Sequence, residues 1–225
     1  MTFSVAARCA KTGMFGLAVS SSSPAVAARC AFVRAGVGAV ASQNITDPAL
    51  GNQCLDLMQN GATALEAVDS ISTNTQHIEY RQLTAVDSHG NSASYIGSQS
   101  LGVFAVSSDT DIVCAGNLLA NDSVPKKMVD AFHTSEGHLA QRLLDVMRAA
   151  LEAGGEAGPV HSAGLLIADK TSWPICDLRV DWDESGKPVH ALQTLWQLYE
   201  PQLEDYVTRA RNPASAPSYA VPGDA

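Results

Sequence analysis

The chain of 225 residues has little charge and lacks paired cysteine motifs. Only 16% of its residues are charged and 46% are hydrophobic, which excludes a disordered chain and indicates a large core. The length allows one large domain or at most two small ones. The five cysteines form no CxxC motif, and their odd number favours buried, reduced thiols.

The sequence has no excess of basic residues and no long hydrophobic run. Lys and Arg number 14 against 23 Asp and Glu, and the net charge of −9 disfavours nucleic-acid and membrane-surface binding. Membrane spans need about 18 apolar residues in a row, and the first residues lack the pattern of a signal peptide. We therefore expect a cytoplasmic protein with neither nucleic acid nor membrane as a partner.

Phosphate-binding and metal-binding motifs are also missing. The sequence contains no GxGxxG, GxxxxGK[ST] or HExxH motif. Among the six histidines, only His133 and His138 lie close together in sequence, and their spacing does not match a zinc site. We expect no cofactor and no metal.

Hydrophobic patterns predict the secondary structure. The predicted strands are residues 2–8, 14–20, 36–43, 82–87, 92–96, 101–107, 111–115, 160–168 and 175–182. Helices are predicted after Asp47-Pro48, after a capping box from Thr63 to Glu66, over residues 121–132 and 136–153, and around 192–199, where Pro201 must kink or restart the last one.

The order of these elements favours an α+β fold. Strands, two helices, strands, two helices, strands and one helix do not alternate as a doubly wound parallel sheet would. The order predicts a four-layer αββα sandwich, in which two mostly antiparallel sheets are covered by helices on both outer faces. Residues 1–211 would form this single domain, and the Pro/Ala/Ser-rich residues 212–225 an extended tail.

Thr2 is a candidate nucleophile. Because threonine is small, an aminopeptidase can remove Met1, which would leave Thr2 with a free α-amine beside its hydroxyl. An amine that titrates near 8 can act as the general base for the hydroxyl without a histidine. The alternative is that Thr2 is an ordinary strand residue, since threonine commonly follows the first methionine.

Several segments resemble one bacterial family of unassigned function in the N-terminal nucleophile hydrolase superfamily, which includes proteasome β subunits and several amidases. They are TFSVAARCAKTGMFGLAVSSSSPAV, RAGVGAVASQNITDP, AGNLLA and DLRVDW. The resemblance extends over about residues 2 to 210. It implies an αββα sandwich and hydrolysis of an amide by the first residue, here Thr2. It implies no particular substrate.

Candidate catalytic partners of Thr2 lie at strand ends. Superfamily members place a basic or polar residue near the end of the second strand to lower the pKa of the amine. This chain has a serine run there, including Ser21, where relatives carry a basic residue, and Arg29 or Arg34 is the alternative. Asn117 follows a strand, where its side-chain amide or backbone N–H would stabilise an oxyanion.

Candidate substrate-binding residues are less specific. Gln43 and Asn44 end the third strand, and His161 begins a later one; each is alternatively a structural polar group. Asp177 and Arg179 alternate with apolar residues and so share one face of a strand. They form either a structural ion network or an anchor for a substrate carboxylate.

We therefore expect a hydrolase that acts on a small amide or cyclic amide through Thr2. The alternative is a scaffold or small-ligand-binding protein with the same fold, and a third reading places a nucleophile at Cys9 or Cys30. A homodimer is expected from the aromatic residues of the C-terminal helical region, Trp196, Tyr199 and Tyr206.

Overall fold

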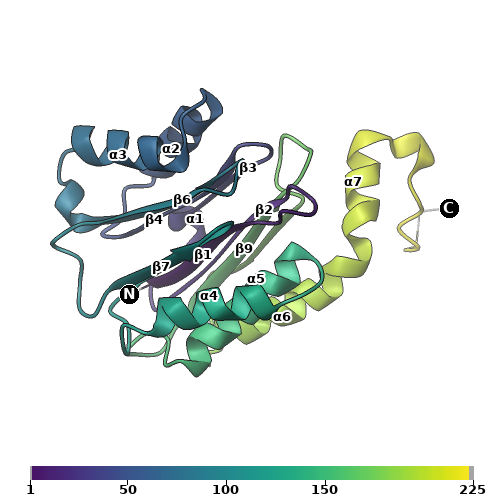
Figure 1. Cartoon of the computed structure of the whole chain (residues 1–225). Helices are drawn as coiled ribbons and strands as arrows, with labels where there is room; N and C mark the ends of the chain where they lie inside the picture. The colour runs from purple at the N-terminus through teal and green to yellow at the C-terminus, as the bar shows by residue number, and fades with distance from the viewer. Residues whose placement is uncertain (1, 223–225) are drawn as a thin grey trace.

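The computed structural model describes residues 2–222, which form two antiparallel sheets packed face to face (Figure 1). The six-stranded sheet has the order β10 (Cys176–Val180), β9 (Ser162–Ala168), β2 (Phe15–Ser21), β1 (Thr2–Arg8), β8 (Ile112–Asn117) and β7 (Ala105–Asp109). The four-stranded sheet has the order β3 (Ala31–Arg34), β4 (Gly38–Asn44), β5 (Arg81–Asp87) and β6 (Ser92–Ile96).

Helices cover the outer face of each sheet. The four-stranded sheet is covered by α2 (Ala49–Gln59) and α3 (Ala64–Asn74). The six-stranded sheet is covered by α4 (Val124–Thr134), α5 (Leu139–Glu152) and α6 (Pro188–Tyr199) (Figure 1). The predicted αββα sandwich is confirmed.

Strand alternation sorts side chains between the layers, as β1 illustrates. Phe3 and Val5 pack in the core beneath the helices, whereas Ala6 packs in the core between the sheets. Thr2 and Ser4 therefore also face the second sheet, because side chains two residues apart share a face. On this face of β1, Ala6 is apolar, and Ser4 and Thr2 make the face polar toward the end of the strand that carries Thr2.

Two short elements were missing from the sequence-based expectation. The helix α1 (Ala27–Cys30) and the strand β3 have only four residues each, too few to show a periodicity. The strand expected over residues 101–107 begins only at Ala105, because the carbonyls of Leu101 and Val103 accept hydrogen bonds from the turn at Leu118 and Leu119 instead of pairing with β8.

Helix signals were more reliable. The Thr63–Glu66 capping box is present at the start of α3. Pro201 ends α6 as expected, and the chain continues through a 3₁₀ turn, η2 (Glu200–Gln202), into α7 (Leu203–Arg211). No helix within residues 2–222 is both long and apolar enough to span a membrane.

The C-terminal segment packs against α7. It contains a 3₁₀ turn, η3 (Pro213–Ser215), and the Arg209 guanidinium lies 3.9 Å from the centre of the Tyr219 ring. Of the aromatic residues on which the expected dimer rested, Trp196 is fully buried and Tyr199 donates a hydrogen bond to the Ile175 carbonyl. These two rings pack within the chain, and the homodimer stays a prediction.

Candidate active site

The three predicted catalytic residues lie together at one end of the space between the sheets. Thr2 begins β1 and is 5% exposed, and its Oγ1 donates to Ser21 Oγ at 3.5 Å. Asn117 is the direct cross-strand partner of Thr2 in the β1–β8 pair. The antiparallel pairing of β1 with β2 and with β8 brings the start of β1 beside the ends of the other two strands.

Behind Thr2 lies a buried chain of amide side chains. Gln82 Nε2 donates to the Gly116 carbonyl at 3.0 Å, and Gln82 Oε1 accepts from Asn117 Nδ2 at 2.8 Å and from Gln43 Nε2 at 3.2 Å. Gln43 Oε1 in turn accepts from Ser4 Oγ at 2.7 Å. The Gly116 carbonyl can only accept, so it fixes which end of the Gln82 amide is nitrogen, and thereby the orientation of the other two amides.

This orientation determines what Asn117 presents to the site. Its nitrogen is bonded to Gln82, and its Oδ1 is buried without a hydrogen-bond partner. An oxyanion requires a donor. The unpaired atom of Asn117 is an acceptor, which suits an N–H or ammonium group instead.

Glu156 is a functional candidate that sequence reasoning missed. It follows α5 and is 5% exposed; its Oε1 accepts from the Ser22 backbone N–H at 3.2 Å. Its Oε2 is buried without a partner. Burial raises the pKa of Glu156 to about 7, against the opposing effects of the positive charge of the N-terminus and of hydrogen bonding from Ser22. No sequence motif marks it, because a loop rather than a periodic element carries it to the end of β2.

His161 is close to the site through its backbone only. Its N–H donates to the Ser21 carbonyl at 2.8 Å. Its ring stacks on Trp182 with centroids 4.4 Å apart, and Nδ1 donates to the Asp183 carbonyl at 2.8 Å. The ring is therefore held by the segment after β10.

The other predicted binding residues separate into buried and peripheral ones. Gln43 belongs to the amide chain described above. Asn44, at the end of β4, has a left-handed φ of 73° and connects two loops, since its Nδ2 donates to the Tyr80 carbonyl and its Oδ1 accepts from the Leu101 N–H. Its side chain is used to hold the loops together.

Asp177 and Arg179 lie away from Thr2. They are on β10, the edge strand, which β9 and β2 separate from β1. Arg179 is exposed and forms a two-pronged ion pair with Asp181, with Nη2–Oδ1 at 2.9 Å. The structure does not bring this pair to the candidate nucleophile.

The alternative basic residues are also engaged elsewhere. Arg29 donates to the Pro24 and Ala25 carbonyls, and Arg34 pairs with Asp56 at 2.7 Å. Neither contact involves Thr2.

The cysteines offer no comparable cluster. All five are buried free thiols. Burial raises the pKa of Cys30. Cys9 lies just beyond the other end of β1, where burial opposes ionisation but hydrogen bonds from Thr12 and Lys11 lower its pKa overall.

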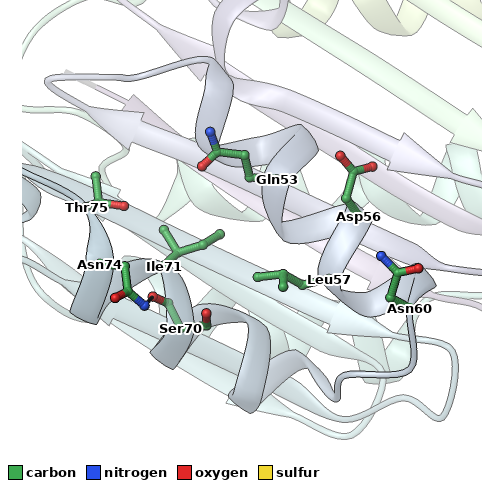
Figure 2. A pocket seen from close by; sticks show the side chains of 8 residues that line it. All are labelled: Gln53, Asp56, Leu57, Asn60, Ser70, Ile71, Asn74 and Thr75. Atoms are coloured by element: carbon green, nitrogen blue, oxygen red, sulfur yellow. Dashed lines mark hydrogen bonds between the residues drawn. The ribbon is translucent and has the colours of Figure 1, made fainter.

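A groove of about 340 Å³ runs between α2 and α3 (Figure 2). Polar side chains such as Asn60 and Asn74 line it, and its carboxylate, Asp56, is already paired with Arg34. The groove lies on the outer side of the four-stranded sheet, away from the inter-sheet face that carries Thr2. It is therefore separate from the Thr2 site.

Comparison with known proteins identifies the family. A model described as a family of unknown function, DUF1028, matches residues 2–192. The chain belongs to the DUF1028 family. A DUF1028 protein from Silicibacter pomeroyi, known from a crystal structure, is 29% identical with a TM-score of 0.82, and the alignment covers 88% of each chain. No curated protein matches.

Other solved structures that match are more distant from this DUF1028 protein. Anbu (ancestral beta-subunit) from Yersinia bercovieri is 14% identical with a TM-score of 0.39, and Anbu from Hyphomicrobium sp. strain MC1 is 12% identical with a TM-score of 0.38. Each alignment covers 97% of this chain and 100% of the other. Likeness at this level establishes no function.

Proposed function

We propose that this DUF1028 protein is an N-terminal nucleophile hydrolase that cleaves a small amide or cyclic amide through Thr2. The observation that carries the proposal is the position of Thr2: it begins a central strand at the polar end of the inter-sheet space, in contact with Ser21 and opposite Asn117. The resemblance of its sequence to the N-terminal nucleophile superfamily adds support.

Removal of Met1 converts the Thr2 nitrogen from a peptide amide into an amine. The amine takes the proton of Oγ1 as Oγ1 attacks the substrate carbonyl carbon, and it passes that proton to the departing amine of the substrate when the C–N bond breaks. The product is an ester of Thr2. Water, deprotonated by the same amine, then attacks the ester, and the acid leaves as Oγ1 recovers its proton.

Ser21 acts in this scheme as a positioning residue. Its Oγ accepts from Thr2 Oγ1 and also from the Ser23 backbone N–H at 3.0 Å. The backbone bond fixes Ser21, and Ser21 in turn fixes the direction of the Thr2 hydroxyl. No basic side chain is needed for this arrangement.

The test is turnover of a panel of small amides and lactams by protein whose Met1 has been removed. Thr2→Ala should abolish release of the amine or ring-opened acid, because the hydroxyl is lost, while Thr2→Ser should retain activity. Thr194→Ala, at an exposed position on α6, is the matched control and should be fully active. Equal turnover by Thr2→Ala would refute the proposal.

A non-catalytic, ligand-binding role is the second candidate. The observation that favours it is the burial of Thr2, which is only 5% exposed. This role predicts that compounds in the same panel raise the melting temperature of wild type and Thr2→Ala equally, with no product formed.

A further inference from the structure

We propose that Asn117 Oδ1 and Glu156 Oε2 together bind an ammonium group beside Thr2. The inference rests on the proposed function, because it takes Thr2 as the nucleophile and names the group that the site holds next to it. Its primary observation is that both oxygens are buried and lack a hydrogen-bond partner.

The two oxygens belong to residues that border Thr2 through different strands. Asn117 faces Thr2 directly across the β1–β8 pair. Glu156 is bonded to the Ser22 N–H, and the neighbouring Ser21 contacts Thr2 Oγ1. The Thr2 end of β1 is thus bordered by an amide oxygen on one strand and a carboxylate oxygen beside the other.

The neighbouring hydrogen bonds oppose a flip of the Asn117 amide, and a rotation of the Glu156 carboxylate would not put a hydrogen-bond donor in place of its oxygen. The Gly116 carbonyl fixes the Gln82 amide, which fixes Asn117 with Nδ2 toward Gln82 and Oδ1 away from it. The other Glu156 oxygen is already occupied by a backbone N–H. Two acceptors, one of them able to carry a negative charge, match the several N–H donors of an ammonium group.

No described basic side chain forms an ion pair with Glu156. Within residues 2–222, the Lys, Arg and His residues that form ion pairs pair with other acidic groups, and none of those pairs includes Glu156. A buried carboxylate is costly unless it is paired or neutralised. A bound ammonium would provide that pairing.

Two sources can supply the same chemistry. One is the α-ammonium of Thr2 itself, which exists only after Met1 is removed. The other is an amino group of the substrate, which would make amides of amino compounds the preferred class. The experiment below separates them.

The experiment is a ¹³C NMR pH titration of the Glu156 side-chain carboxyl in selectively labelled full-length protein, assigned with Glu156→Gln. Three samples are compared: the chain with an N-acetylated Met1, which has no α-ammonium, the chain beginning at Thr2, and the latter with ethylammonium chloride. Sodium chloride at the same ionic strength is the salt control. An ammonium group in the site should lower the pKa of Glu156 by at least about one pH unit, since an opposite charge favours the carboxylate.

Each outcome bears on the proposal. A lower pKa on exposing the Thr2 amine identifies that amine as the ligand, and a lower pKa only with ethylammonium identifies a substrate amine. An unchanged pKa in both comparisons overturns the ammonium site. Because no turnover is measured, the site stands or falls separately from hydrolysis by Thr2.

A second measurement guards against misfolding of a variant. In the chain with an N-acetylated Met1, where no α-ammonium competes, ethylammonium should raise the melting temperature of the wild type and of Glu152→Gln, an exposed position on α5, more than sodium does. It should not do so for Glu156→Gln. The same stabilisation in Glu156→Gln would contradict the assignment.

Discussion

Gln82 is the residue on which the order of the Thr2 site depends most. It is fully buried and bonds at once to the Gly116 carbonyl, Asn117 and Gln43. No sequence motif marks it, because its partners come from β4 and β8, far away along the chain. Its role became visible only through the pairing of the two sheets.

Gln82→Leu should therefore destabilise the protein strongly. Leucine keeps the approximate volume but removes the side-chain donor to the Gly116 carbonyl and leaves the amide nitrogens of Asn117 and Gln43 without their acceptor, and each buried unpaired group costs about 1–3 kcal/mol. We expect a loss of at least about 2 kcal/mol in urea unfolding. Gln53→Leu, at an exposed position on α2, is the control and should change stability by less than about 0.5 kcal/mol. Equal effects would show that the amide chain is not structural.

Glu156 should make stability depend on pH. Burial raises its pKa from 4.5 to about 7, so the folded chain keeps a proton that the unfolded chain loses. In the chain with Met1, the contribution of Glu156 to the free energy of unfolding should be most favourable below pH 4.5. It should fall between pH 4.5 and 7 and stay level above pH 7. Glu156→Gln should remove this decline and be more stable above pH 7 by about 3 kcal/mol. Parallel stability curves for the two proteins between pH 4 and 8 would contradict the role of burial.

The sequence marks Thr2, Ser21 and Asn117 separately, Ser21 through the resemblance to the superfamily, and the antiparallel pairing of β1 with β2 and β8 brings them together. Asp177 and Arg179 are not brought to them. The alternation of polar and apolar residues correctly predicts that these two residues share one face of a strand. It does not predict where that strand lies in the sheet, and β10 is at the edge. Glu156 was missed because loops carry no periodic signal.

At the scale of single elements, local signals identified the longer helices and most strands. The capping box before α3 needs only Thr63 and Glu66, three residues apart, and both of its hydrogen bonds are present. The short elements α1 and β3 depend on the packing of the second sheet over β2 and β9 rather than on local preference. Their existence therefore could not be derived from local sequence.

Thr63→Ala should cost about 1 kcal/mol, because the Glu66 N–H at the start of α3 loses its acceptor. Thermal or urea unfolding measures the difference. Thr73→Ala is the matched control at an exposed position near the other end of α3, and should be neutral or slightly stabilising because alanine favours helix. A similar loss in both variants would indicate that the cap does not contribute.

At the scale of the whole molecule, the order of strands and helix pairs was enough to predict four layers. The order of elements does not determine how the two sheets are aligned over each other. That alignment places β4 and β5 against β1 and β8 and creates the polar site. The aromatic residues expected at a dimer interface have the same ambiguity. The sequence pattern of a stripe such as Trp196 and Tyr199 is the same whether the rings pack on their own sheet or on a second chain.

We propose that Thr2, once Met1 is removed, is a nucleophile. The most direct measurement is the intact mass of the Thr2-first chain after incubation with a β-lactone. Attack by Thr2 Oγ1 on the lactone carbonyl breaks the ring C–O bond, and the released alkoxide takes the proton, so the whole mass of the reagent is retained. We expect one added reagent, located on Thr2 by fragmentation and absent from Thr2→Ala and from the chain with Met1. No adduct, or an equal adduct in Thr2→Ala, would contradict it.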